Sequence, residues 1–488
     1  MSRINSNVPS LIAQRNLQSS QRALRLSLER LSSGLKINRG ADNPAGLIVS
    51  ERLRSEVKVV EQAIDNSARA INVIATTEGA LNEVQALLTD IQALTVEAAN
   101  SGAFSDEEIA ANQLQIDNAI DSITRIANTT TFSGRKLING ELDYVTSGVN
   151  AAQLADVTVQ STKFGAQSFV SVNVDVAQSA QQAQLAFAGP GLGASSVTLD
   201  IRGPDGIITL SFPASATTVE MAAEINRQID ATGLTAVTSG TGGSAGLLIR
   251  SLEYGSDAFV SVRPQGTSAT FALVDRQNVS NNRTTGRDTV ATINGVAANA
   301  DGLKLSFSST LLKVEVVLNE TFGSGAVSNG STKPGASSFA ITEGGALFQL
   351  GPQVNTNLQE NIGVKSMQAG KLGNSVVGFL SELQSGQARA LNTGNFQQAS
   401  KIVQEVITQV AVLRGRLGAF ERNTLQPNIR QLQITRENLT SSESVIRDTD
   451  FAEETSELTR AQILVQAGNS IVAIANAQSQ NVLSLLGG

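Results

Sequence analysis

Long amphipathic helical patterns lie near both ends of this chain, and they constrain its fold more than any other feature does. Near the N-terminus, leucines recur at spacings of 7, 4, 3 and 4 residues: Leu17, Leu24, Leu28, Leu31 and Leu35. This spacing gathers apolar side chains on one face of a helix and is typical of a coiled-coil seam. The same spacing also fits a single amphipathic helix that packs on a globular core.

A polar, glycine-bearing stretch over residues 31–53 interrupts this pattern. Helical periodicity then resumes, and mostly apolar residues, with Glu78 and Gln85 among them, step by 3 and 4 from residue 57 to about residue 99. Ser105 and Glu108 match a capping box, so they predict the start of another helix, which should run to about Asn128.

Helical periodicity returns in the last quarter of the chain. Apolar residues step by 3 and 4 from Ile402 to Phe420, and Pro427 interrupts or kinks this helix. The polar stretch 440–450 is expected to break the chain before a last helix at 451–484. The two outermost helices have no core of their own, so their stripes must bury against each other or against other chains. We expect ends that become ordered in an assembly.

The middle of the chain changes character over residues 141–340, where Gly, Ser and Thr rise and apolar residues alternate with polar ones. The stretch "VTLDIRGPDGIITLSF", residues 197–212, predicts a β-hairpin that turns at "GPDG". Thr217 and Glu220 match a capping box at the start of one helix. The middle is therefore expected to be a β-rich domain with one helix.

Composition excludes several classes of chemistry. The 488 residues include no Cys and no His, so zinc–thiolate sites, Ser-His-Asp triads and Cys-His pairs cannot form in this chain. Aromatic residues make up only 4% of the chain, and this suits helix packing by aliphatic side chains. No motif indicates a cofactor or a metal, and no pair of carboxylates is singled out by its spacing. We therefore expect no enzymatic activity.

Charge and hydropathy exclude two kinds of partner. The net charge of −7 gives no basic field for nucleic acid. Residues 461–488 carry no charge, yet many Asn, Gln and Ser residues interrupt them, which argues against a membrane span. Residues 1–40 hold seven basic residues and one acidic residue, whereas residues 441–488 hold six acidic and two basic ones. Ends of opposite sign attract each other if the fold brings them together.

Several stretches at the two ends resemble the bacterial flagellins. They are "LSSGLKIN", "ADNPAGLIVSERLRS" and "TTTFSGRKLING" near the start, and "RLGAF", "DTDFAEETSELTRAQILVQAG" and "NVLSLLGG" near the end. They fall in the expected order, and the resemblance covers about residues 1–180 and 340–488. In the middle, "VATINGVAANADGLKLSF" resembles a small hook-type motif that recurs in flagellin centres.

The resemblance implies a fold that is mainly α with a β-rich insert and nested termini. Residues 1–40 and 450–488 would pair as a coiled-coil inner-tube domain. Residues 41–184 and 336–449 would form an outer-tube helical bundle with a short β part. Residues 185–335 would form a variable, surface-exposed α+β domain that is rich in strands.

The resemblance also gives roles to particular residues. Residues 31–53 would be the spoke segment between the inner and outer tube layers, although an ordinary loop between helices has the same composition. Its glycines supply backbone freedom, and Asp42 or Asn43 can cap the next helix ahead of Pro44. The spoke residues are Gly34, Gly40, Asp42, Asn43, Pro44 and Gly46. The residues expected in inner-tube assembly are Leu17, Leu24, Leu28, Leu31, Ile463, Val472, Val482, Leu483 and Leu485.

The implied function is that of a structural subunit that polymerises into the flagellar filament, the extracellular propeller for motility. Its partners would be other copies of the chain, an export chaperone on the C-terminal helix, the filament cap and the hook-filament junction proteins. The resemblance also implies type III export without a cleaved signal peptide, which agrees with the lack of a basic region followed by an apolar core in residues 1–16.

An innate immune receptor of the Toll-like class is also implied as a partner, through the outer-tube helix. Asp90 stands where strongly recognised flagellins carry an arginine, and Gln115 stands where an acid is common, while Leu94 is kept. We therefore expect weakened recognition.

Other functions fit parts of the sequence. A hook-filament junction protein shares the terminal helices, but "NVLSLLGG" and "DNPAGL" favour the filament subunit. A central domain that acts as an adhesin is a second alternative, although neither an aromatic platform nor an acidic calcium loop marks a ligand site there. A protease insert of the kind some flagellins carry would need zinc-binding histidines, which this chain lacks.

Overall fold

The chain folds into two compact units. The computed structural model describes residues 7–100, 102–165, 167–189, 191–192, 195–239, 246–265, 271–323 and 335–486, and for residues 239, 321, 323, 335 and 478–486 it describes the backbone alone. We call the first unit the terminal unit; it holds Met1–Arg69, Gln349–Val354 and Arg422–Gly488. The second, the central unit, holds Ala70–Phe348 and Asn355–Glu421.

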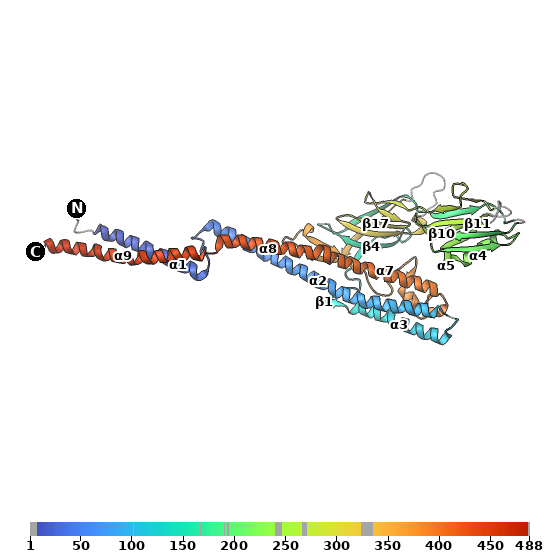
Figure 1. Ribbon diagram of the computed structural model, residues 1–488, viewed down its shortest axis with the longest axis horizontal. Coiled ribbons are helices and arrows are strands. Elements are labelled where there is room, and N and C mark those ends of the chain that lie inside the picture. The colour runs from blue at the N-terminus through green and yellow to red at the C-terminus, as the bar shows by residue number, and fades with distance from the viewer. Residues whose placement is uncertain are drawn as a thin grey trace. The chain divides into compact units, whose positions relative to one another are not determined.

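Helices make up the two ends of the chain, as the 3–4 stepping predicts, and Figure 1 draws them as coiled ribbons in blue and in orange to red. The helices at the two ends are α1 Val8–Ser33, α2 Pro44–Ala98, α3 Asp106–Thr129, α7 Phe396–Phe420, α8 Gln426–Arg447 and α9 Phe451–Leu486. Three short helices lie in the middle of the chain: α4 Thr218–Arg227, α5 Ile229–Thr232 and α6 Glu320–Gly323. Shorter turns are η1 Thr356–Leu358, η2 Leu380–Leu383, η3 Leu391–Thr393 and the π-helical η4 Glu421–Leu425.

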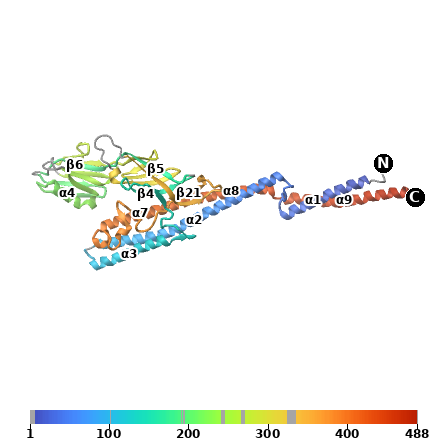
Figure 2. The same cartoon turned by 180° about the vertical axis from the view of Figure 1, so that it is seen from behind.

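In the terminal unit, α1 and α9 lie side by side and run antiparallel (Figure 2). The start of α1 meets the far part of α9, because the Asn7 side-chain amide donates to the carbonyl of Ala475 at 3.0 Å. The end of α1 meets the start of α9, where Arg30 and Glu454 form an ion pair at 3.4 Å. The basic and acidic ends of the sequence are therefore neighbours in the fold.

The last two long helices differ from the sequence-based expectation at their junctions. Pro427 does interrupt the regular pattern, because the π-helical turn η4 precedes it and α8 begins at Gln426. The break expected over residues 440–450 is present but shorter than predicted, since α8 continues to Arg447 and only residues 448–450 separate it from α9. Serines do not end the helix there, because a side chain such as Ser442 hydrogen-bonds the carbonyl four residues earlier.

The helices of the central unit pack by their apolar stripes. The stripe predicted between 57 and 99 is buried on α2 at Leu81 and Leu88, with Val84 buried between them where Gln85 was predicted. The stripe from Ile402 to Leu417 is buried on α7. The capping box of Ser105 and Glu108 forms as predicted at the start of α3. The predicted periodicity is thus confirmed on these helices.

Strands fill the part of the chain between α3 and α7. They are β1 Thr131–Phe132, β2 Arg135–Lys136, β3 Tyr144–Ser147, β4 Leu154–Thr162, β5 Val170–Gln178, β6 Gln182–Phe187, β7 Val197–Arg202, β8 Ile207–Phe212, β9 Leu234–Ser239, β10 Gly246–Tyr254, β11 Phe259–Gln265, β12 Leu273–Val274, β13 Arg283–Thr285, β14 Val290–Ile293, β15 Val296–Ala297, β16 Asn299–Asp301, β17 Lys304–Ser308, β18 Leu312–Leu318, β19 Gly335–Gly344, β20 Ala346–Gln349, β21 Gln359–Ile362, β22 Gly373–Asn374 and β23 Gly378–Phe379.

The main strands form two β modules, each with its own core. In the first module, sheets in the orders β12-β6-β10-β9 and β13-β11-β7-β8 share a core with α4. In the second, sheets in the orders β15-β14-β5-β19-β3 and β16-β17-β18-β4 enclose a separate core. The predicted hairpin is confirmed, since β7 pairs with β8 from Val197 opposite Phe212 to Arg202 opposite Ile207.

The strands of the two modules differ from the domain limits expected from the sequence. The boundaries at 184/185 and 335/336 cut β6 and β19, so both need to move. The reason is long-range pairing: β5 pairs with β14 and with β19, which lie more than 100 residues later in the sequence. A β region therefore begins at β3, inside the stretch for which a helical bundle with only a short β part was expected.

Candidate assembly site

The seam between α1 and α9 is built from small and medium-sized residues. On α1, buried Ser10, Ala13 and Ser27 alternate with half-buried leucines at steps of 3 and 4. On α9, Ala461 and Ala475 are buried, and half-buried residues lie between them at the same steps of 3 and 4. Gly468 faces Leu17, and a Cβ built on this glycine would lie 3.1 Å from Leu17 Cδ1. Small residues thus allow the two helices to approach closely.

The structure divides the predicted inner-tube residues into three groups. The residues that line the intrachain seam and are half-buried are Leu17, Leu24, Leu31 and Val472. Two others point away from the seam, since Leu28 is 49% exposed and Ile463 is 60% exposed. The side chains of Val482, Leu483 and Leu485 lie outside the described part of the structure.

Large apolar side chains remain exposed on both helices after the seam has formed. They are Val8, Leu11, Ile12 and Leu28 on α1, and Phe451, Ile463, Leu464, Ile471 and Ile474 on α9. Ile474, at 67%, is among the most exposed of them. Clusters of exposed apolar side chains on this scale mark interaction surfaces in soluble proteins.

The spoke segment has the local geometry that its residue types predict at three positions. Gly34 ends α1 with φ of +72°, and its N–H donates to the carbonyl of Arg30 at 2.8 Å. Asn43, not Asp42, caps α2: its side chain accepts from the N–H of Gly46 at 2.9 Å, directly ahead of Pro44. Gly46 has no room for a side chain, because a Cβ there would lie 2.8 Å from Ile37 Cδ1.

Asp42 closes the turn before α2 instead of capping the helix. Its carboxylate accepts from the N–H groups of Arg39 at 2.8 Å and Asn38 at 3.0 Å. These two hydrogen bonds lower the pKa of Asp42 below its ordinary value. Gly40 is exposed, with a side chain of Leu47 3.7 Å from where its Cβ would stand.

Two backbone segments pair within the terminal unit at the spoke. Leu35 and Asp448 form an isolated antiparallel bridge, in which the N–H of Lys36 donates to the carbonyl of Arg447 at 2.7 Å. Ile37 lies beside this bridge in sequence and is only 2% exposed. The spoke segment is therefore anchored by backbone pairing and by one buried aliphatic side chain.

The residues expected to face a receptor lie on the surface of α2 and α3. Asp90 and Gln115 are exposed, and Leu94 is half-buried. Gln113, two residues before Gln115, was missed by sequence reasoning although it is buried. Its side chain donates to the carbonyl of Leu383 at 2.8 Å and accepts from the N–H of Leu391 at 2.7 Å.

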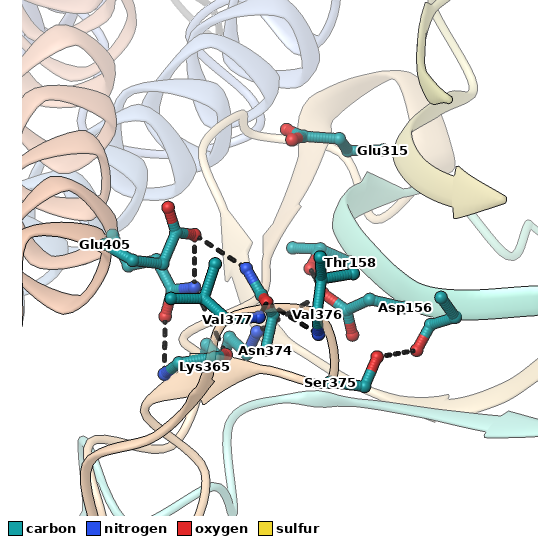
Figure 3. A network of polar contacts seen from close by, with 12 residues as sticks. Asp156, Thr158, Glu315, Lys365, Asn374, Ser375, Val376, Val377 and Glu405 are labelled. Carbon is teal, nitrogen blue, oxygen red and sulfur yellow. Dashed lines mark hydrogen bonds and ion pairs between the residues drawn. The ribbon is translucent and has the colours of Figure 1, made fainter. Parts of the chain in front are cut away.

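A cleft of about 920 Å³ lies in the central unit, between the second β module and α7. The polar groups at its base bind one another (Figure 3): Asn374 donates to Glu405 at 3.2 Å, and Lys365 lies 3.7 Å from Asp156. These polar contacts tie the β module to the loop ahead of α7. Within the described residues, no group of three or more Asp or Glu residues is placed to hold a metal ion.

Burial perturbs two ionisable groups beside this cleft. Burial raises the pKa of Asp143 above its usual value, and it raises the pKa of Tyr144 to about 12. The phenol of Tyr144 accepts from the N–H of Thr162 at 3.1 Å, which places it in the core of the second β module.

A membrane-spanning segment would need a long helix of apolar residues, and the helices in the described ranges include none of this kind.

Comparison with known proteins assigns the family. Residues 4–143 match the bacterial flagellin N-terminal helical region, and residues 400–486 match the bacterial flagellin C-terminal helical region. A flagellin of Salmonella rubislaw is 31% identical, and a B-type flagellin of Pseudomonas aeruginosa is 30% identical, each over 99% of both chains. The solved structure of FliC from Burkholderia pseudomallei shares 14% identity and covers 74% of this chain and 99% of that one, with a TM-score of 0.24. With relatives matched along nearly their whole length, the chain belongs to the bacterial flagellin family.

Proposed function

We propose that this flagellin builds the filament by burying the exposed apolar faces of α1 and α9 between copies. As a flagellin, the chain is a structural subunit of the flagellar filament and not an enzyme. The observation that carries the proposal is the division of the two helices into a seam of small residues and an outer set of large apolar residues. Burying each large aliphatic side chain contributes about 1.5–3 kcal/mol.

The same division supports a layered arrangement. In this proposal α1 and α9 form the coiled coil of the inner tube, and α2, α3, α7 and α8 form the outer-tube bundle, joined by the spoke segment. The strand-rich stretch between them projects toward solvent. A contact that repeats head to tail without closing yields an open helical filament.

Further partners are part of the proposal through the family. An export chaperone would cover α9 before assembly, because its exposed apolar face would otherwise promote aggregation. The filament cap would receive the chain at the growing end, and the hook-filament junction proteins would receive the first subunits. Type III export would deliver the chain to the extracellular filament without a cleaved signal peptide.

A Toll-like receptor would bind this chain weakly. Asp90 and Gln115 are both exposed, so their side chains are available to a partner, and an acid at position 90 reverses the charge expected of strongly recognised flagellins. A reporter-cell response as strong as that to an enterobacterial flagellin would contradict this proposal.

Seeded assembly tests the main proposal. The intact chain and a chain that lacks residues 1–40 and 451–488 would each be added to short filament seeds and viewed by negative-stain electron microscopy. The account predicts long filaments from the intact chain alone. An intact chain that binds the ends of the seeds without elongating them would favour the junction-protein function. Filaments from the truncated chain would contradict a role for α1 and α9 in assembly.

A further inference from the structure

The terminal unit has a pocket that its own chain does not fill. A cavity of about 470 Å³ opens at the spoke segment, between the end of α1, the first turns of α2 and the end of α8. Its apolar lining includes Ile37, Val49 and Ile446, and its basic lining includes Arg30 and Lys36. A cavity of this size lies within the range of about 300–1,000 Å³ that holds small ligands, so it has room for an aromatic side chain.

The charge balance of this pocket favours an acidic partner. Lys36 is exposed and makes no ion pair with any described residue, and Arg30 Nε is buried without a hydrogen-bond partner among them. The acid in the lining, Asp42, is already engaged by two backbone N–H groups. The pocket thus combines apolar walls with the uncompensated positive charge of Lys36, since Arg30 is already ion-paired with Glu454.

The same unit also presents a side chain of the complementary kind. Phe451 is the only aromatic residue in the sequence of the terminal unit, yet it is 58% exposed at the start of α9. It does not line the pocket of its own chain. An exposed acid lies two positions away, since Glu453 makes no ion pair with the described residues, whereas Asp450 caps α9 and is engaged by two backbone N–H groups. Aromatic anchors with polar rims are typical of energetically dominant contacts between proteins.

We infer that Phe451 of one copy docks in the spoke pocket of a second copy, where its acidic neighbour Glu453 faces Lys36. This inference rests on the proposed polymerisation and adds the contact that joins successive copies. Side chain and pocket occupy different places on one chain, so the contact is heterologous, and in the proposed filament it repeats from copy to copy without closing. It therefore predicts a contact between spokes in addition to the contacts of the inner tube.

Crosslinking tests this contact directly, because the native chain has no cysteine and gives no background. An Ala452→Cys chain, which keeps Phe451 and carries its cysteine at the exposed next position, and a Val49→Cys chain would be assembled together on seeds and treated with a short bis-maleimide. Two singly substituted chains can react only between copies. The matched control is Val59→Cys, on the same helix about 15 Å farther along, with 41% exposure against 47% for Val49.

The expected result is a covalent dimer with Val49→Cys that is at least about tenfold more abundant than with Val59→Cys. Filaments that form but give equal dimer yields would overturn the inference while leaving polymerisation intact. Failure of the wild-type chain to form filaments would count against the proposed function instead. As a second measurement, Phe451→Ala should raise the critical concentration for assembly at least about tenfold, and Phe451→Tyr should restore it. An unchanged critical concentration for Phe451→Ala would also overturn the inference.

Discussion

Replacing Gln113 by Met should destabilise the central unit far more than the same change at Gln115. Gln113 is 3% exposed, and its side chain joins α3 to the loop that holds η2 and η3. The substitution keeps the size and helix propensity of the residue but removes the hydrogen bonds. Two backbone groups then lose their partner: the carbonyl of Leu383, a residue that is 0% exposed, and the N–H of Leu391, which is 1% exposed.

The magnitude follows from those two groups. Each buried backbone group without a partner costs about 1–3 kcal/mol, and the buried Met side chain recovers part of this, so we expect a net loss of about 2–4 kcal/mol. Gln115 is exposed and makes no such bonds, so Gln115→Met should change stability by less than about 0.5 kcal/mol. Urea unfolding followed by circular dichroism measures both. Equal midpoints and slopes for the two variants would refute the reasoning.

Four further predictions follow from single residues. Gly34→Ala should cost about 1–2 kcal/mol through its φ of +72° alone, since no atom lies within 4 Å of the added Cβ, and a melting curve that matches the wild type would contradict this. Asn43→Ala should weaken the first turn of α2 by about 0.5–2 kcal/mol, seen as faster hydrogen exchange at the amide of Gly46. Asp143 has a raised pKa in the folded state, so its stability contribution falls as pH rises above 3.8; Asp143→Asn should therefore flatten the pH dependence of the unfolding free energy in that range, and an unchanged slope would argue against the burial effect. In a Tyr254→Phe chain, the phenolate absorbance of Tyr144 should appear only near pH 12, and titration near pH 10 would show that the ring is not buried.

The helical architecture could be predicted from the sequence because its signal is local. Apolar steps of 3 and 4 and the capping box of Ser105 and Glu108 each depend on residues within a few turns of one another. The exact face of α1 could not be predicted in the same way. The predicted apolar stripe included Leu28, whereas the observed seam contains Ser20 and Ser27. These are small polar residues, which a search for apolar periodicity does not detect.

Features that depend on residues far apart in the chain could not be predicted from the sequence. Gln113 matters because of backbone groups 270 and 278 positions later in the chain. The extent of the β region depends on β4 pairing with β18 and on β5 pairing with β14 and β19. Strand propensity indicates that strands exist but not which of them are neighbours, so the limits of this region had to come from the structure.

The central claim, that the outer faces of α1 and α9 drive polymerisation, is tested most directly by one matched pair of substitutions. Ile474 on α9 is 67% exposed, and Ile207 on β8 is 63% exposed, so Ile→Ser removes the same side chain from two positions of similar exposure. The account predicts that Ile474→Ser raises the critical concentration for growth on filament seeds at least about tenfold, while Ile207→Ser leaves it unchanged. Equal critical concentrations for the two variants and the wild type would contradict the account.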